Sequence, residues 1–262
     1  MDDDGRRVGV FARAAARYGQ VGPDLFGHFA SHVVELLDLA PGSFLLDVAC
    51  GTGAVLAEAM RVIGPDGCAI GVDLTPAMVA QAAAHSPRPC VAVMDALALG
   101  FADNNFDAVT SNFALTYFTD PHSALAECRR VLRPNGRLGL VVHDGWWWHD
   151  DPRWAWHAPL LEELGNRYAT APRRFREPKS VVDVVAQAGF ANATASVEPF
   201  DLRWVDANEW WNWCWSHGYR VVLEEFDDAT LVEFRAACFS HLQSESIAAT
   251  LPVICIVADK GE

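Results

Sequence analysis

The amino-acid sequence contains neither a long apolar run nor a long basic run. No apolar stretch approaches the ~20 residues that a membrane span requires, and the acidic start has no apolar signal core. No basic cluster is longer than a pair such as Arg173-Arg174, and 34 acidic against 20 basic residues give a formal net charge of -14. A nucleic-acid interface normally carries a basic patch. We therefore expect a soluble, cytoplasmic protein with neither a nucleic-acid nor a membrane partner.

Cysteine pairs of the C-x-x-C type are also absent. The seven cysteines are an odd number and are scattered along the chain. This spacing argues against a disulfide framework and against a zinc site, and it favours reduced, mostly buried thiols. No group of His, Asp and Glu residues has metal-ligand spacing either. We expect no bound metal.

Tryptophan is absent from the first 145 residues. Of the ten tryptophans, five lie in residues 146–156 and five in residues 204–215. For a single tryptophan, burial in a hydrophobic core is the more common role. Because both clusters follow strands that we expect to reach one edge of a sheet, we interpret them together as a lid that supplies an apolar pocket and excludes water.

Apolar residues make up 51% of the chain, which is enough for a sizeable core. Short apolar runs alternate with segments of helical spacing, and this predicts an α/β fold with a seven-stranded, mostly parallel sheet, helices on both faces and a Trp-rich helical lid. The expected strands are residues 43–50, 68–73, 90–95, 106–113, 137–144, 193–200 and 251–259. The expected helices are two within residues 8–39, then 54–63, 76–84, 121–132, 178–188 and a Trp-rich helical region at 206–243.

The chain shows no internal repeat and no low-complexity linker, so we expect residues 1–262 to form one domain. Within it we distinguish N-terminal helices (1–39), a ligand-binding core (40–145), two lid segments (146–180 and 204–245) and closing strands (193–200 and 251–259).

The first expected strand runs into the segment LLDVACGTGAV, in which Gly51 and Gly53 precede a helix. Glycines let the backbone turn tightly and approach a ligand, and a helix N-terminus directs free N–H groups toward anionic groups. A dinucleotide fingerprint needs a third glycine at the position of Leu56, so NAD fits poorly. Asp47, four residues before Gly51, would repel a pyrophosphate but could attract an ammonium group.

Two further acids end the next two strands. Asp73 is placed to accept both hydroxyls of an unphosphorylated ribose, and Asp95 to accept from an exocyclic amine such as adenine N6. Any one of these acids could merely anchor a loop or cap a turn. Three of them in register with a glycine loop instead predict a ligand that combines an amino acid, a ribose and an adenine, as S-adenosylmethionine does.

With these residues the sequence resembles the class I S-adenosylmethionine-dependent methyltransferases. It is most similar to the type 11 small-molecule branch, which includes ubiquinone/menaquinone biosynthesis methyltransferases and polyketide-tailoring methyltransferases. The resemblance covers about residues 40–145 and rests on LLDVACGTG, GVDLTPAMV, MDALALGFADNNFDAVTSNFAL and ECRRVLRPNGRLGLVVHD. It implies a Rossmann-like fold and an enzyme that converts S-adenosyl-L-methionine to S-adenosyl-L-homocysteine.

The resemblance also implies a role for individual residues. Asp47, Ala49, Cys50, Gly51 and Gly53 would hold the methionine end of the donor, Asp73 the ribose, Leu74 and Met78 the adenine face, Asp95 and Ala96 the adenine edge, Asn112 and Phe113 the surroundings of the sulfonium, and Tyr18 would close over the carboxylate. Two departures stand out. Ala49 replaces the usual first glycine, and SNFALTYF replaces a His-containing segment, so no base can be carried over at Thr116 or Tyr117.

The expected reaction is methyl transfer to a hydroxyl of a hydrophobic small-molecule natural product, polyketide-like or aromatic. A base whose pKa lies near neutrality would assist it. Our candidates are His143 at the end of the fifth strand, then His217 and His149 in the lid, each of which could equally be structural. The sequence leaves open C- or N-methylation, a non-methylating step such as cyclisation, a non-catalytic donor-binding role, and whether the chain forms a homodimer.

Overall fold

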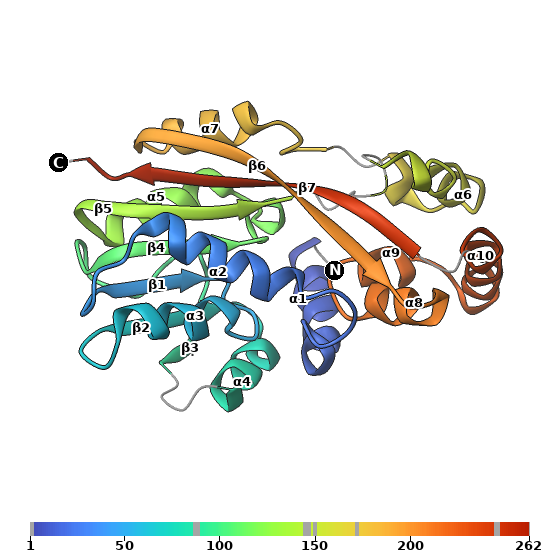
Figure 1. The fold of residues 1–262 in the computed structure, drawn as a ribbon, viewed down its shortest axis with the longest axis horizontal. Coiled ribbons are helices and arrows are strands. Elements are labelled where there is room, and N and C mark those ends of the chain that lie inside the picture. The colour runs from blue at the N-terminus through green and yellow to red at the C-terminus, as the bar shows by residue number, and fades with distance from the viewer. Residues whose placement is uncertain are drawn as a thin grey trace.

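The structure is a computed structural model that describes residues 3–85, 90–143, 148, 151–170, 173–243 and 247–261. A seven-stranded sheet with the order β3-β2-β1-β4-β5-β7-β6 forms its centre (Figure 1). β1 to β5 are parallel, and β7 runs antiparallel to both β5 and β6. This confirms the expected fold class. The strands are β1 Phe44–Val48, β2 Cys68–Asp73, β3 Val91–Val93, β4 Phe106–Asn112, β5 Leu132–Val142, β6 Ala191–Trp204 and β7 Ile247–Asp259.

Helices cover both faces of the sheet, as expected. α2 and α3 pack on one face in an apolar cluster that includes Phe29 and Leu45, and α5 and α7 pack on the other in a cluster that includes Leu46 and Val181 (Figure 1). The α-helices are α1 Asp3–Ala14, α2 Leu25–Leu37, α3 Ala54–Ile63, α4 Pro76–His85, α5 Pro121–Val131, α6 His157–Glu163, α7 Pro178–Gln187, α8 Ala207–Trp215, α9 Arg220–Leu223 and α10 Asp228–His241. Two short 3-10 helices are η1 Ala15–Arg17, which follows α1, and η2 Leu115–Tyr117, which follows β4.

The last two strands are longer than the sequence pattern indicated. β5 ends at Val142, opposite Ile254, whereas β6 and β7 continue to pair with each other as far as Trp204 and Ile247. They form a two-stranded ribbon beyond the main sheet, and the helices α8, α9 and α10 lie around its tip (Figure 1). Apolar periodicity could not reveal this extension because it depends on the pairing of one strand with the other.

Two side chains take over the role of a neighbouring strand where β5 has ended. The carboxylate of Asp151 accepts the backbone N–H of Thr250 at 2.8 Å, and the indole N–H of Trp154 donates to the carbonyl of Ala248 at 2.9 Å. Asp151 also pairs with Arg153. The otherwise open edge of β7 is thereby bound to the segment that leads into α6.

The tryptophans that the structure describes pack chiefly against one another. Trp154 lies with ring centroids 5.6 Å from Trp210 and 6.0 Å from Trp204, and Trp204 lies 5.0 Å from Trp213. These four rings are at most 3% exposed, as is that of Trp148. Their packing role therefore agrees with the common fate of single tryptophans rather than with an aromatic ligand cage. Trp146 and Trp147 lie outside the described residues. We call α6, α8, α9, α10 and the ribbon tip the lid.

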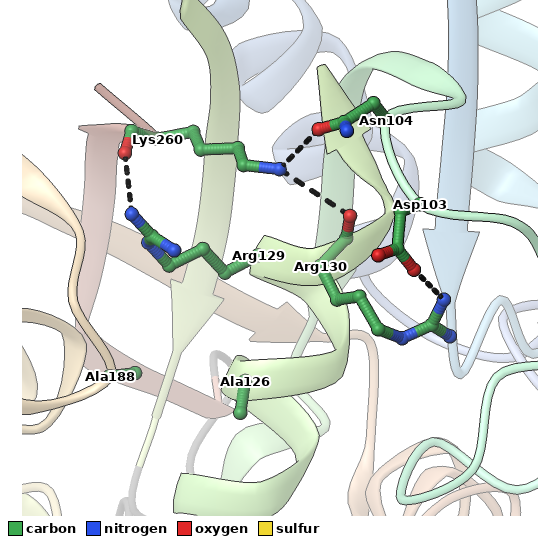
Figure 2. Close-up of a pocket in the computed structure, with 7 residues that line it drawn as sticks. All are labelled: Asp103, Asn104, Ala126, Arg129, Arg130, Ala188 and Lys260. Carbon is green, nitrogen blue, oxygen red and sulfur yellow. Dashed lines mark hydrogen bonds and ion pairs between the residues drawn. The ribbon is translucent and has the colours of Figure 1, made fainter. Parts of the chain in front are cut away.

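Lys260, which directly follows β7, binds the end of α5, the start of β5 and the turn before β4 (Figure 2). The ammonium group of Lys260 donates to the side chain of Asn104 at 2.7 Å and to the carbonyls of Arg130 and Leu132 at 3.4 and 2.5 Å. Arg129 donates in turn to the Lys260 carbonyl at 3.3 Å. Asn104, Arg129, Arg130 and Lys260 line a cavity of about 300 Å³. Their hydrogen bonds hold neighbouring chain segments together, so we assign them a structural role.

Candidate active site

A second cavity, of about 130 Å³, lies at the carboxyl ends of β1 to β4. This is the edge at which open α/β sheets bind their ligands. Ten of the thirteen residues predicted to bind the cofactor line it; these are Tyr18, Ala49, Gly51, Asp73, Leu74, Met78, Asp95, Ala96, Asn112 and Phe113. Asp47, Cys50 and Gly53 do not line it. The remaining lining residues are Phe11, Thr75, Met94, Ala114, Tyr117 and Phe118.

Every second residue of the loop between β1 and α3 has a left-handed backbone conformation. Ala49, Gly51 and Gly53 have φ angles of 59°, 53° and 90°, and Gly53 is the N-cap of α3. Ala49 therefore adopts a conformation that favours glycine. Leu56, at the position of a third fingerprint glycine, is buried, and its side chain lies 2.7 Å from where a Cβ on Gly71 would be. A glycine at position 56 would let α3 approach β2 closely, whereas the side chain of Leu56 occupies the space between them.

Asp47 lies behind this loop rather than in the cavity wall. It is 1% exposed, and its carboxylate accepts the hydroxyl of Thr110 at 2.8 Å. Burial raises the pKa of Asp47 to about 7; the hydrogen bond from Thr110 opposes this shift, and the nearby charge of Asp73 adds to it. Asp47 can therefore change charge near neutral pH.

Asp73 and Asp95 reach the cavity from the ends of adjacent strands. The two carboxylate oxygens of Asp73 accept the N–H groups of Gly51 at 2.9 Å and Thr75 at 2.8 Å, and burial raises its pKa. Asp95 is exposed and accepts the N–H of Leu97 at 2.9 Å through one oxygen. Both acids thus stabilise turns through backbone N–H groups, which is the structural role considered for each of them from the sequence. Both also line the cavity.

Asn112 and Phe113 form the wall contributed by β4. The amide nitrogen of Asn112 donates to the carbonyl of Phe29 at 3.4 Å, and its amide oxygen is buried without a hydrogen-bond partner among the described residues. Phe113 has a φ of 56°, an uncommon conformation for a bulky residue. Unsatisfied buried polar atoms and strained backbone conformations are features that occur often at functional sites.

An aromatic cluster closes the side of the cavity nearest the N-terminus. The ring of Phe11 lies 5.1 Å from Tyr117 and 6.2 Å from Tyr18, and Tyr18 stacks at 4.5 Å on Phe26. Burial raises the pKa of the Tyr18 phenol, and the nearby Tyr117 and Asp73 add to that shift. Sequence reasoning found Tyr18 but missed Phe11, Tyr117 and Phe118. Tyr117 and Phe118 belong to the segment SNFALTYF. From the sequence we considered this segment only as a source of a catalytic base, not for aromatic rings that line the cavity.

The three candidate bases differ in how the structure places them. His143 directly follows β5 and is half-buried. The Nδ1 atom of His217 lies 2.6 Å from the carbonyl of Trp213, its ring packs 4.0 Å from that indole, and burial lowers its pKa to about 4. Neither lines the cavity described above. His149 lies outside the described residues.

The fold and this cavity at its carboxyl edge are those of open α/β proteins that bind a nucleotide-like ligand, and comparison with known proteins makes the class specific. The family described as "Methyltransferase domain" matches residues 46–140. Nocamycin O-methyltransferase from Saccharothrix syringae is 31% identical over 270 residues, covering 93% of this chain and 95% of that protein. The chain belongs to the class I S-adenosylmethionine-dependent methyltransferases, of the type that acts in natural-product and quinone biosynthesis, and its cofactor is S-adenosylmethionine.

Two further similarities agree with this assignment. The ubiquinone/menaquinone biosynthesis C-methyltransferase UbiE from Paracoccus denitrificans is 39% identical over 181 residues, covering 64% of this chain and 67% of that protein. The solved structure of the cyclase SpnF matches with a TM-score of 0.59 at 21% sequence identity, covering 98% of this chain and 94% of that chain. The second similarity shows a shared fold alone.

Among the helices of the described segments, none is both long and apolar enough to cross a membrane. In those segments, no three His, Cys, Asp or Glu side chains gather as a metal site requires. The expectation of metal-independent catalysis stays a prediction.

Proposed function

We propose that this methyltransferase transfers a methyl group to a hydroxyl of a hydrophobic small molecule, polyketide-like or aromatic. One observation carries the donor half of the proposal: two strand-end acids, a left-handed glycine loop and an asparagine with an unsatisfied amide oxygen line a single cavity. The similarity to nocamycin O-methyltransferase over 95% of that protein supports a hydroxyl acceptor.

Each side of the cavity suits one part of the donor. Asp73 would accept the ribose hydroxyls and Asp95 the adenine amine, because each keeps carboxylate lone pairs beyond those that its turn uses. Leu74 and Met78 offer apolar surface to the adenine faces. The glycine loop, with Asp47 behind it and Tyr18 above it, would hold the amino-acid end.

Asn112 suits the charged centre of the donor. A sulfonium carries a positive charge but no N–H or O–H, so it is best matched by an oxygen that other donors leave unsatisfied. The buried Oδ1 of Asn112 is such an atom, and Phe113 lines the same cavity. These residues would stabilise the charge and limit the volume in which the methyl group can lie.

The bound donor supplies an already activated methyl group, so the main task of the chain is orientation. Holding two reactants in line can contribute on the order of 7 to 11 kcal/mol. Among the candidate bases we favour His143, since it follows the strand next to the donor wall. A pKa of about 4 makes His217 a weak base at neutral pH. His149 stays a third candidate.

Calorimetry tests the donor site. We expect S-adenosylhomocysteine to bind the purified chain, NAD to fail, and Asp73→Ala to weaken binding by at least about tenfold, the loss expected for hydrogen bonds to a charged group. Asp66→Ala, an exposed acid far from the cavity lining, is the matched control and should bind as the wild type does. Wild-type protein that binds no S-adenosylhomocysteine would refute the donor site.

Isotope transfer tests the acceptor. The chain is incubated with trideuteromethyl-labelled donor and a panel of hydroxylated aromatic and polyketide-like compounds, and the products are analysed by mass spectrometry. A labelled methyl ether supports the proposal. Label on carbon or nitrogen would contradict the hydroxyl acceptor, and a product of unchanged mass would indicate cyclisation or another non-methylating step.

A further inference from the structure

The side of the donor cavity nearest the N-terminus is formed by a short segment that we call the donor cover, residues 9–18. Phe11 and Tyr18 of this segment line the cavity. The cavity measures about 130 Å³, well below the roughly 300 to 1,000 Å³ of small-molecule sites. Part of the lining must therefore move before a nucleoside of the donor's size can enter. The donor cover is a lining segment at the N-terminal end of the chain and is not built into the sheet.

The donor cover is also bound to the lid by a cluster of charges. Arg13 donates from Nε to Glu224 at 2.7 Å and makes a second contact through Nη2, so that it grips both carboxylate oxygens. Arg220 donates to the same carboxylate at 2.6 Å and to the backbone carbonyl of Arg13 at 3.3 Å. Moving the donor cover away from the cavity would break these contacts to α9.

A second contact joins the same two parts without charge. A Cβ at position 218 would lie 2.2 Å from the hydroxyl oxygen of Tyr117 and 3.6 Å from the ring of Phe11. Only glycine therefore allows the backbone between α8 and α9 to approach these two cavity residues so closely. Gly218 is the place where the lid, the donor cover and the turn after β4 meet.

Gly218 cannot shift independently of the lid. Its neighbour Tyr219 is buried, and its hydroxyl lies 2.6 Å from Nε2 of His157 inside the tryptophan core. On the other side, His217 is held by the carbonyl and the ring of Trp213. A displacement of Gly218 must therefore carry α8 and the aromatic core with it.

We propose that Tyr117 and Gly218, together with the Arg13–Glu224–Arg220 cluster, couple donor binding to the position of the lid. Tyr117 is the positioning residue: it touches the donor cavity with its ring and the lid backbone with its hydroxyl. This inference rests on the proposed donor site. Its consequence is that an occupied donor site holds α8 and α9 in place over the methyl group, and that release of the product nucleoside loosens them.

Hydrogen exchange of the wild-type chain with and without S-adenosylhomocysteine tests the coupling. We expect slower exchange in residues 207–223, which do not line the donor cavity. Calorimetry on the same sample keeps two failures apart. If the nucleoside does not bind, the donor site itself fails, and this inference falls with it. If it binds and exchange in 207–223 is unchanged, the coupling alone is refuted.

Stopped-flow release of S-adenosylhomocysteine from variants provides the second test. Glu224→Gln should release it about threefold faster, since the cluster is partly exposed to solvent. Gly218→Ala should release it about tenfold faster because of the steric overlap with Tyr117. Lys179→Gln, which breaks an exposed ion pair with Asp183, is the control and should release it at the wild-type rate. Wild-type rates in both lid variants would overturn the proposal.

A rescue separates the coupling from simple damage to the lid. Removing the hydroxyl through Tyr117→Phe leaves the ring carbon Cζ, 3.1 Å away, as the nearest atom to the alanine methyl group in place of the oxygen at 2.2 Å. The double variant with Gly218→Ala should therefore release the nucleoside more slowly than Gly218→Ala alone. If the two substitutions merely weaken the fold, their effects should add instead, and the assigned role of Tyr117 would be wrong.

Discussion

At the scale of single residues, the acid behind the glycine loop has the most informative chemistry. Asp47 is fully enclosed, and burial raises its pKa to about 7. An unfolded chain would ionise it at about 3.9. Between these two values the folded chain binds more protons than the unfolded chain, so this carboxyl lowers stability as the pH rises through that window. In the proposed complex, the ammonium group of the donor would offset the cost.

We therefore predict that Asp47→Asn removes a pH dependence. Relative to the asparagine variant, the wild-type chain should lose on the order of 2–4 kcal/mol in free energy of unfolding between about pH 5 and pH 8. Urea unfolding at the two pH values measures this loss. Saturating S-adenosylhomocysteine should reduce it in the wild type. Parallel pH profiles of the two proteins would show that Asp47 ionises normally.

Many residues that line the cavity at the carboxyl edge were predicted to lie together, whereas their surroundings were not predicted. Asp73 and Asp95 could be placed because parallel strands end at one edge of a sheet, and the glycine loop could be placed because its spacing is local. The aromatic wall was different. Phe11 is about a hundred residues from Tyr117, and nothing in either segment indicates that the rings meet at 5.1 Å. Long-range packing has no periodic signal.

At the scale of elements, the lid is built around one buried polar contact. Within the tryptophan core, the Tyr219 hydroxyl and the Nε2 atom of His157 are 2.6 Å apart, and both side chains are at most 5% exposed. The ring of Trp148 lies 4.6 Å from His157 and 5.2 Å from Tyr219. A hydrogen bond enclosed by apolar rings contributes to stability and fixes how α6 packs against the turn before α9.

Tyr219→Phe should therefore destabilise the chain by about 1–2 kcal/mol. Chemical unfolding followed by tryptophan fluorescence measures the change, since the affected rings surround the contact. Tyr168→Phe is the matched control: its hydroxyl accepts an exposed hydrogen bond from Arg167, and its loss should change stability by less than about 0.5 kcal/mol. Equal effects of the two substitutions would contradict the role of the buried pair.

The element boundaries show where sequence patterns stop being informative. α3 and β2 begin and end at the predicted residues because a glycine or a strand-end acid marks each limit. β6 and β7 extend beyond the predicted limits because their tips are stabilised by each other. The tryptophans were assigned to a ligand pocket on collective grounds, yet those described mostly fill the space between ribbon and helices. Composition indicated their number but not which surface they face.

At the scale of the whole molecule, we propose that the chain is one domain in which the lid unfolds together with the core. One apolar cluster runs without a break from Ile63 of α3 through Phe29 of α2 to Trp210 and Phe234 of the lid. Because the lid and the core share this cluster, we expect no boundary at which the lid could unfold separately from the core.

This proposal predicts coincident unfolding transitions. All ten tryptophans follow residue 145, so fluorescence reports on the lid, whereas far-ultraviolet circular dichroism reports on all helices and strands. The two signals should give the same urea midpoint within error, which is the usual criterion for two-state unfolding. A fluorescence transition at lower urea would show that the lid unfolds first and that the chain has two cooperative units.

The position of β7 in the sheet has a consequence for synthesis on the ribosome. β7 lies between β5 and β6, although it follows both along the chain. β6 therefore emerges with no partner to hydrogen-bond, and an exposed strand is prone to mispairing. Assembly of this half of the protein must wait until the final strand is translated and inserted, and a nascent chain stalled before that point would need protection from aggregation.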